Sequence, residues 1–409
     1  RKLVGAARDR ALRRVTLDAL QRAALSWYDP SLFSDLADAL FREALQARDW
    51  ELIYDMAGSA ACRTSPVMAA RCAYVAARAH ELGLATESDA DAGSVDHGKT
   101  DLVLHVPAAS QALDSYRAIM NDPSLPLHYR ALAAWRLGEE PSLLPPDRSA
   151  PENQGEPDPL EGFLSGFERY EMADLMLNEA SQRSTILDRE SLRRLATLLA
   201  QEAHPDLSMR LIGVLMKRAD WDPRRSDFEL LYPRPYLSEV RSLRSRINLP
   251  EPIVLGLLRS ESYFQADVVS AAGAVGLAQL MPSTAAEIAR TLGIASYDLT
   301  KPRDNLRFGI AYFSDLLAET GHPLQAMWAY NAGRSRLKKW NADMKDLPDD
   351  LKLEALGIEE TRQYGRNILQ ASVMYGELYY GVPVATMTGE IVDGERAWLR
   401  PEAPPITGP

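Results

Sequence analysis

Residues 250–282 of the 409-residue sequence read PEPIVLGLLRSESYFQADVVSAAGAVGLAQLMP, and they carry the most informative pattern in the chain. Pro250 and Pro252 are typical of a helix start, because the N–H that proline lacks has no intrahelical acceptor there. The following positions recur at the spacing of one buried helix face: Val254, Leu257, Leu258 and Glu261. The stretch therefore predicts a helix whose buried face ends in a glutamate.

Glu261 is an unusual residue for the end of an apolar stripe. A carboxyl group among aliphatic neighbours is hard to ionise, because a low-dielectric environment disfavours its charged form. Such a group is suited to donate a proton near neutral pH. The alternative is a glutamate at the edge of the stripe that reaches solvent or an arginine, and the helix pattern alone favours that alternative.

Three further segments favour the proton-donating role of Glu261. The first is Gly276-Leu277-Ala278-Gln279, where glycine permits turns or close approach that larger residues resist. Residues 329–333 read AYNAG and end an apolar helical run, and residues 360–364 read ETRQY and open another helix-like segment. Each motif alone is weak, but the Glu261-Ser262 pair and these three segments occur in one order at compatible spacing.

Together these motifs resemble the catalytic domain of the soluble lytic transglycosylases, lysozyme-like enzymes that cleave peptidoglycan. The family pattern is a Glu-Ser pair, a Gly-Leu-Met-Gln segment, an Ala-Tyr-Asn-Ala-Gly segment and a late Glu-Thr-Arg-x-Tyr. Ala278 departs from this pattern, since the family usually has methionine there. The departure implies a differently shaped wall on the substrate side, while the proton donor Glu261 is intact.

The resemblance implies peptidoglycan glycan strands as the substrate and gives the catalytic role to Glu261 alone. In the family, one glutamate first protonates the leaving oxygen of the β-1,4 bond between N-acetylmuramic acid and N-acetylglucosamine. It then acts as a base while the muramoyl 6-hydroxyl closes a 1,6-anhydro ring. The residues that the resemblance implies to bind substrate are Ser270, Gln279, Met281, Tyr330, Asn331 and Glu360.

Several of these residues also have a structural interpretation. Tyr330 could be a core aromatic with a satisfied hydroxyl, and Glu360 could open a helix, where the macrodipole favours an acidic residue. Ser262 is expected to bond within its helix or to a neighbouring loop. Asp267 is expected to be a turn or cap residue, so a single-acid mechanism fits the sequence better than the two carboxylates of most glycosidases.

Two other functions stay open at this point. A hydrolytic muramidase, similar to goose-type lysozyme, differs only in whether water or the 6-hydroxyl attacks. An inert scaffold is a different class, in which the helical half of the chain binds proteins. The intact Glu261, Gln279 and Tyr330 argue against inertness. In the leading hypothesis the protein is an enzyme whose helical region docks or orients glycan strands.

Helical periodicity dominates the chain and strand signals are nearly absent, so we predict an all-α fold. Short helices of similar length in residues 1–225 indicate a solenoid-like, helical-repeat accessory region. Polar and proline-rich stretches predict loops near 85–101 and 138–160 within it. Residues 226–390 are expected to form the lysozyme-like catalytic domain.

The C-terminal part of the chain has a different pattern. Residues 382–392 read VPVATMTGEIV, and their short apolar alternation indicates a small strand pair. Residues 391–409 form a proline-rich tail that we expect to pack loosely or to lean on the domain surface.

The composition disfavours several classes of partner. A net charge of −11 and a pI near 5.2 argue against nucleic acid, because phosphate binding needs a concentrated basic face. No apolar run approaches the ~20 residues of a membrane span. The histidines are scattered, so no metal site and no cofactor is predicted. The sequence begins at Arg1 without a signal peptide, which we interpret as a mature or trimmed chain, and the resemblance implies the periplasm or cell envelope of a bacterium.

Cys62 and Cys72 are the two cysteines of the sequence. Within one continuous helix their Cα atoms would lie ~15 Å apart, which is too far for a disulfide. The break at Thr64-Ser65-Pro66 would allow a bridge across a turn. Of these two states, a pair of buried free thiols is the expected one.

Overall fold

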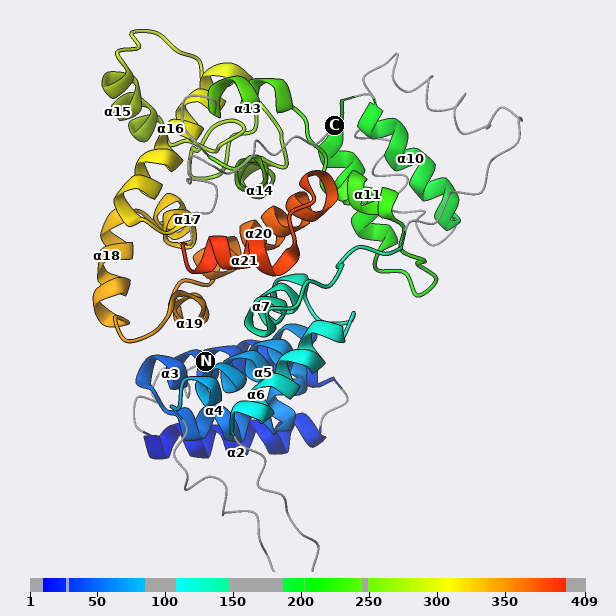
Figure 1. Ribbon diagram of the computed structural model, residues 1–409, viewed down its shortest axis with the longest axis vertical. Coiled ribbons are helices and arrows are strands. Elements are labelled where there is room, and N and C mark those ends of the chain that lie inside the picture. Colours follow the sequence, from blue (N-terminus) through cyan, green and yellow to red (C-terminus); the bar gives the residue numbers. More distant parts are fainter. Residues whose placement is uncertain are drawn as a thin grey trace, which may run out of the picture. The chain divides into compact units, whose positions relative to one another are not determined.

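The computed structural model describes residues 10–26, 29–84, 108–146, 187–201, 203–244 and 249–394. Within these ranges the regular elements are helices, and β-structure is limited to two isolated bridges in residues 269–280 (Figure 1). The predicted all-α fold is confirmed. The expected loop at 85–101 lies outside the described residues, as do residues 147–160 of the second expected loop and residues 395–409 of the tail.

Packing divides the chain into two units. The first comprises Arg1–Pro141, Thr320–Gln370 and Val384–Glu395, and the second comprises Ser142–Glu319, Ala371–Pro383 and Arg396–Pro409. These units are defined by packing alone. The predicted division into an accessory region, residues 1–225, and a catalytic domain, residues 226–390, concerns activity and stays a prediction.

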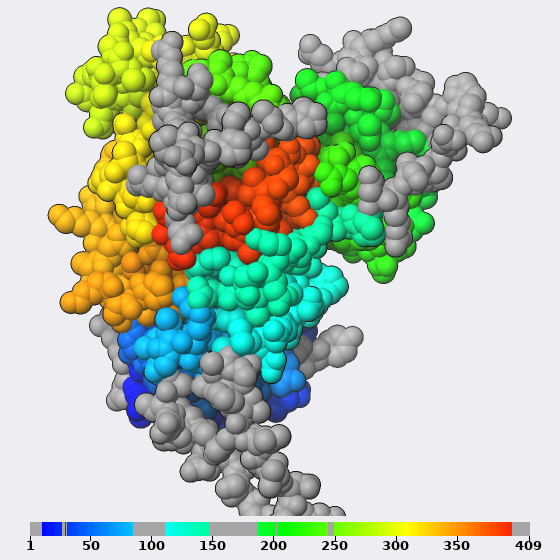
Figure 2. Space-filling model, viewed as in Figure 1, coloured from blue at the N-terminus to red at the C-terminus, as the bar shows by residue number. Residues whose placement is uncertain are grey.

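The first unit contains helices from both ends of the chain. They are α2 (Arg10–Ser26), η1 (Pro30–Phe33), α3 (Ser34–Ala47), α4 (Trp50–Ala57), η2 (Ala60–Thr64), α5 (Pro66–Glu81), α6 (Ala108–Asn121), α7 (Leu127–Leu137), α17 (Pro323–Ala332), α18 (Arg334–Asp343), α19 (Asp349–Ala355) and α21 (Val384–Val392). Consecutive helices from α4 to α7 pack on one another, and Figure 2 shows this series as a packed surface coloured blue to cyan. Such neighbour-on-neighbour packing is typical of helical repeats. Late in the sequence, α19 packs on α3 and α5, and α21 packs on α7 and α17.

The second unit is also helical. Its elements are α10 (Arg189–Gln201), α11 (Pro205–Leu215), α12 (Arg225–Leu231), α13 (Leu237–Arg244), α14 (Glu251–Ser262), α15 (Pro282–Leu292), α16 (Pro302–Thr320) and the π-helical turn η4 (Gly376–Tyr380). The long helix α20 (Glu359–Tyr375) contributes residues to both units.

Helix α14 is more deeply buried than its sequence pattern predicts. The helix begins after Pro250, as expected, but residues 251–258 are all buried and not only those of one face. Ile253, Leu255 and Gly256, which lie off the predicted stripe, have no more contact with solvent than the stripe itself. A helix that is apolar all round belongs in a core, so α14 is a central helix of its unit.

The strand pair expected at residues 382–392 is wrong, because residues 384–392 form the helix α21. Distant groups stabilise the helix: the carboxylate of Glu140 accepts hydrogen bonds from the N–H groups of Ala385 at 2.8 Å and Thr386 at 3.2 Å. Gly389 lies so close to Trp135 that a Cβ there would be 2.9 Å from the indole nitrogen. Contacts made outside the segment thus override its local β-propensity.

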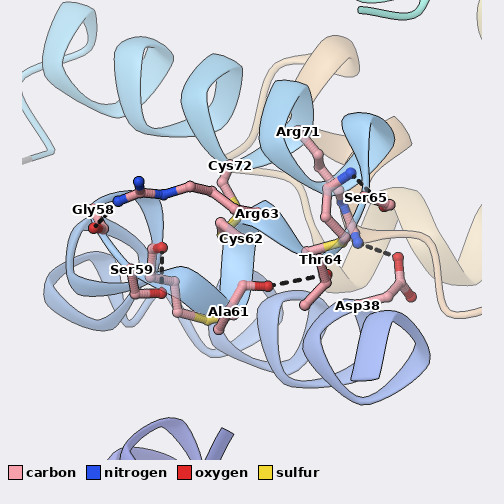
Figure 3. Close-up of a disulfide and its surroundings, with 12 residues drawn as sticks. Asp38, Gly58, Ser59, Ala61, Cys62, Arg63, Thr64, Ser65, Arg71 and Cys72 are labelled. Carbon is pink, nitrogen blue, oxygen red and sulfur yellow. Dashed lines mark hydrogen bonds and ion pairs between the residues drawn. A yellow bond between two sulfur atoms is a disulfide. The ribbon is translucent and has the colours of Figure 1, made fainter. Parts of the chain in front are cut away.

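The expectation of two free thiols is also wrong, because Cys62 and Cys72 form a disulfide (Figure 3). Helix η2 ends at Thr64 and α5 begins at Pro66, with Ser65 extended between them. The chain therefore reverses between the two cysteines, and their Cα atoms lie 6.2 Å apart. This is the turn that the Thr64-Ser65-Pro66 break allowed.

Across the described parts of the chain, every helix is too short or too polar to cross a membrane. The same residues contain no cluster of three or more His, Cys, Asp or Glu side chains that could hold a metal ion.

Candidate active site

Glu261 lies in the last turn of α14, where the chain turns sharply. The N–H of Tyr263 closes the helix by donating to the carbonyl oxygen of Arg259 at 3.2 Å. Tyr263 and Phe264 both have left-handed backbone conformations, with φ of 51° and 66°, which residues other than glycine adopt rarely. The glutamate itself is half-buried. The helix predicted from the sequence is present, and Glu261 lies at the end of its apolar stripe.

Ser262 ties the end of α14 to the segment that follows. Its hydroxyl donates a hydrogen bond to the carbonyl oxygen of Leu277 at 2.8 Å, and the side chain is buried. Leu277 lies within the Gly-Leu-Ala-Gln motif, 15 positions further along the chain. The structural role expected for Ser262 is therefore confirmed, and two motifs of the sequence meet at this bond.

Residues 268–280 form a compact loop that is braced by its own backbone and by Gln279. Val275 and Leu280 exchange two backbone hydrogen bonds, at 3.0 and 3.1 Å. The Gln279 amide nitrogen donates to the carbonyl oxygens of Val268 at 3.2 Å and Gly276 at 2.9 Å. Its two N–H groups are thus used inside the loop, which leaves the Gln279 side-chain carbonyl for any ligand.

The side chain of Asn305, from α16, holds the same loop by hydrogen bonds. Its amide nitrogen donates to the carbonyl oxygens of Val275 and Leu299, both at 2.8 Å, and its amide oxygen accepts from the N–H of Ala278 at 2.7 Å. The side chain is fully buried. Sequence reasoning missed this residue, and the one signal for it is an amide beside the apolar positions of a predicted helix.

Gly276 is required by the close approach of Asn305. It has a φ of 76°, and a Cβ at this position would clash with the Asn305 amide and lie 2.5 Å from the carbonyl oxygen of Leu299. Neither contact can relax cheaply, because both neighbours are bonded to each other. The close packing of the loop against α16 therefore requires glycine at position 276.

The remaining residues of this segment differ in exposure. Ala278 is fully buried, and the altered substrate-side wall inferred from it stays a prediction. The Ser270 hydroxyl accepts a hydrogen bond from the N–H of Ala274 at 3.0 Å, which stabilises a turn. Met281 is 41% exposed and precedes α15, as an apolar wall for a ligand would require.

A cluster of aromatic residues and one arginine holds the C-terminal end of α14. Arg259 donates to the carbonyl oxygen of Leu231 at 2.9 Å, and its guanidinium lies over the ring of Tyr232 at 4.7 Å from the centroid. The Tyr232 ring meets Tyr375 edge to face, with centroids 5.6 Å apart. Burial raises the pKa of Tyr375 well above its usual value, so this tyrosine stays neutral. The sequence motifs did not reveal this cluster.

The N-terminal end of α14 is held in a similar way. Glu251 accepts a hydrogen bond from the Tyr380 hydroxyl at 2.6 Å and pairs with Arg241 at 3.2 Å. The Tyr375 hydroxyl donates to the carbonyl oxygen of Pro233 at 2.7 Å. Both ends of the helix are thus fixed by side chains from segments that are distant in sequence.

The other predicted site residues belong to the first unit. Tyr330 and Asn331 are half-buried near the end of α17, and Glu360 is exposed in the first turn of α20. The Asn331 amide donates to Glu360 at 3.3 Å and accepts from the hydroxyl of the buried Thr361 at 2.6 Å. The AYNAG and ETRQY motifs therefore meet through Asn331.

The structure thus brings the predicted residues together in two groups. Glu261, Ser270, Gln279 and Met281 lie in the second unit, around the end of α14 and the loop after it. The second group, Tyr330, Asn331 and Glu360, lies in the first unit, around the start of α20. Each group is organised by hydrogen bonds within its own unit.

Part of the chain matches a known protein family. Residues 240–352, which include Glu261, match the family model "Transglycosylase SLT domain". The soluble lytic murein transglycosylase of Salmonella typhimurium is 26% identical over 294 residues, which are 68% of this chain and 42% of that protein. The chain therefore spans less than half the length of this relative.

Two solved structures share the fold. The 70 kDa soluble lytic transglycosylase of Escherichia coli matches 96% of this chain and 57% of its own, with a TM-score of 0.67 and 21% identity. An inactive mutant of the lytic transglycosylase Slt of Pseudomonas aeruginosa matches 90% of this chain and 57% of its own, with a TM-score of 0.62 and 25% identity.

Fold and motifs together define a helical protein that carries a Transglycosylase SLT domain. The chain is similar in sequence and in fold to the soluble lytic murein transglycosylases, which are enzymes.

Proposed function

We propose that this protein is a peptidoglycan lytic transglycosylase that cleaves the β-1,4 bond between N-acetylmuramic acid and N-acetylglucosamine. One observation carries the proposal: Glu261, within the residues that match the SLT domain, is half-buried in the last turn of a central helix. The C-terminal end of a helix carries partial negative charge and favours an uncharged carboxyl group beside it. Such a group can act as the acid of a glycosidase.

Glu261 would act twice in the reaction. Its carboxyl group first donates a proton to the glycosidic oxygen, as the bond from that oxygen to C1 of the muramoyl sugar breaks and the electron pair leaves with the oxygen. The resulting carboxylate then removes the proton of the muramoyl 6-hydroxyl, whose oxygen forms the new bond to C1. The product ends in 1,6-anhydromuramic acid, no water is consumed, and Glu261 regains its proton.

The surrounding residues suit the binding of an N-acetylated sugar. Met281 offers an exposed apolar surface, and the Gln279 carbonyl can accept a hydrogen bond. Ser270 would add a hydroxyl near the loop turn. In the first unit, Tyr330, Asn331 and Glu360 would present polar groups to the glycan strand. Neither a metal nor a cofactor takes part in this scheme.

We also propose that the protein acts in the periplasm or cell envelope of a bacterium, on peptidoglycan glycan strands. Structural disulfides persist mainly in oxidising compartments, and the Cys62–Cys72 disulfide supports such a location. Residues 226–390 would carry the catalysis, and residues 1–225 would help to dock or orient the strand.

The products of peptidoglycan digestion test this function. Purified sacculi treated with the protein should release muropeptides that end in 1,6-anhydromuramic acid and are one water lighter by mass spectrometry than hydrolysed ones. Glu261→Gln should bind sacculi and release no products. Glu287→Gln, which removes an exposed carboxylate of α15, is the matched control and should keep full activity.

Each alternative predicts a different product. Reducing ends without the anhydro ring would make the protein a hydrolytic muramidase. No products from the folded wild-type protein, and no difference between it and Glu261→Gln, would favour the inert scaffold.

A further inference from the structure

The arginine of the ETRQY motif is a buried residue that pairs with the N-terminal part of the chain. Arg362 is 1% exposed, and its Nη2 lies 2.7 Å from the Oδ2 of Asp38. Its Nη1 donates to the carbonyl oxygen of Leu356 at 3.1 Å. Asp38 belongs to α3 and is 324 positions away in sequence, far outside residues 240–352, which match the SLT domain.

Asp38 also holds a second buried arginine. Arg71 of α5 is fully buried, and its guanidinium reaches the other carboxylate oxygen of Asp38 (Figure 3). Arg71 precedes Cys72, so the disulfide fixes the chain beside it. One carboxylate of α3 is therefore shared by arginines from α5 and α20.

A buried glutamate closes this network on the other side. Glu354 of α19 is fully buried, pairs with Arg71 at 2.8 Å and with Arg366 of α20, and accepts a hydrogen bond from the Tyr129 hydroxyl at 3.1 Å. Burial alone would raise the pKa of Glu354, but Arg366 and Arg71 lower it to about 2. Two arginines one turn apart thus attach the first half of α20 to Asp38 of α3 and Glu354 of α19, and Arg71 of α5 pairs with the same two carboxylates.

The residues just before Arg362 are those that hold Asn331. Thr361 is fully buried and donates to the Asn331 amide oxygen at 2.6 Å, and Glu360 accepts from the amide nitrogen at 3.3 Å. Backbone atoms link Glu360, Thr361 and Arg362 directly. A shift of Arg362 would therefore move both partners of Asn331.

We propose that Asp38 is a positioning residue for the substrate-binding group Asn331 and Glu360, because it fixes Arg362 and with it the start of α20. The inference rests on the proposed function, since it assumes that this group contacts the glycan strand. It gives the N-terminal helices a part in the site itself. Asp38 of α3 supplies the negative charge that pairs with Arg362 and so aligns the ETRQY motif.

The substitution Asp38→Asn tests the proposal, because it removes the charge of Asp38 and keeps a side chain of similar size. The side chain of Asp38 is 22% exposed, so water can partly replace the lost charge and the fold should survive. Misplaced substrate-binding groups weaken binding, and we expect KM for glycan strands to rise about tenfold with kcat within about threefold of the wild type. Asp38→Glu keeps the charge and should recover most of the loss.

A merely structural role predicts a different result. Partial unfolding lowers the active fraction, and thus the apparent kcat, and leaves KM unchanged. The matched control is Asp350→Asn, which breaks another buried pair of the same unit, with Arg78 at 2.6 Å, and makes no bond to Arg362. It should lower the melting temperature at least as much as Asp38→Asn and leave KM unchanged.

Two results would overturn the proposal: an unchanged KM in folded Asp38→Asn, or an equal rise of KM in Asp350→Asn. Hydrogen exchange at residues 359–366 separates this failure from a failure of the proposed function. If the wild-type protein forms no anhydromuropeptides, the function fails by itself. Faster exchange there in Asp38→Asn than in Asp350→Asn would still support the ordering of α20 by Asp38, and equal exchange would refute it.

Discussion

The hydroxyl of Ser262 donates a hydrogen bond to the carbonyl oxygen of Leu277 at 2.8 Å, so the residue beside Glu261 is joined to the loop that carries Gln279. The bond is buried and crosses between two separate motifs of the sequence. It fixes the end of α14 relative to residues 268–280 at the point where the proposed acid is presented.

Ser262→Ala should weaken both stability and catalysis. It leaves the buried Leu277 carbonyl without this partner, which costs about 1–3 kcal/mol of unfolding free energy. It also loosens the turn that presents Glu261, and we expect kcat to fall about tenfold. Urea denaturation and product release from sacculi measure the two effects. Ser260→Ala is the control, because the Ser260 hydroxyl has no hydrogen-bond partner in the described part of the protein. Equal activity of both variants would show that the bond does not position the acid.

Gly276→Ala should be strongly destabilising. The new Cβ would overlap the Asn305 side chain and the Leu299 carbonyl oxygen, and the backbone has a φ of 76°. Overpacking and backbone strain together should cost about 2–4 kcal/mol. Gly273→Ala shares the strained φ, at 88°, but meets open space, so it should cost only about 1 kcal/mol. Chemical denaturation of both variants compares the costs, and similar values would mean that Asn305 can move aside.

Reduction of the Cys62–Cys72 disulfide should lower stability. The bridge closes a loop with a sequence separation of 10, and its loss should cost about 3 kcal/mol, mainly because the unfolded chain gains freedom. A thermal melt with and without reductant measures the change. The double variant Cys62→Ser/Cys72→Ser should melt at the lower temperature in both conditions. A melting temperature unaffected by reductant in the wild type would contradict the prediction.

Stability should fall as the pH is lowered below about 6.5. Burial, with Arg366 nearby, lowers the pKa of His128 from 6.5 to about 3. Between these values the unfolded chain binds a proton that the folded chain does not, so the native state loses stability as the pH falls. Glu354, with a pKa of about 2 against 4.5, adds a loss in the same direction below pH 4.5.

His128→Leu should remove the first part of this dependence. Between pH 6.5 and 5 the histidine accounts for about 2 kcal/mol of the lost unfolding free energy, so the variant should show a flatter profile in that range. Urea denaturation at pH 7, 6 and 5 measures it, and His204→Leu, which alters an exposed histidine, should keep the wild-type slope. Parallel slopes for all three proteins would exclude His128 as the cause.

Local pattern in the sequence was enough to place the helix α14, the glutamate at its end and the order of the motifs. Proline at the helix start, apolar spacing and glycine in turns act over a few residues, so they can be read from neighbours in the chain. The all-α fold followed from the same periodicity, and so did the break before Pro66 that proved to be a turn.

Tertiary structure decided what depends on distant partners. Residues 382–392 alternate like a strand, but Glu140 and Trp135 make residues 384–392 a helix. The two cysteines pair because the chain reverses between them, and Gly276 is set by an asparagine of α16. In the sequence Arg362 is only a member of the ETRQY motif, whereas in the fold it forms an ion pair with Asp38 of α3. Burial of a charge or a backbone group demands a partner, and nothing local in a sequence says which distant residue supplies it.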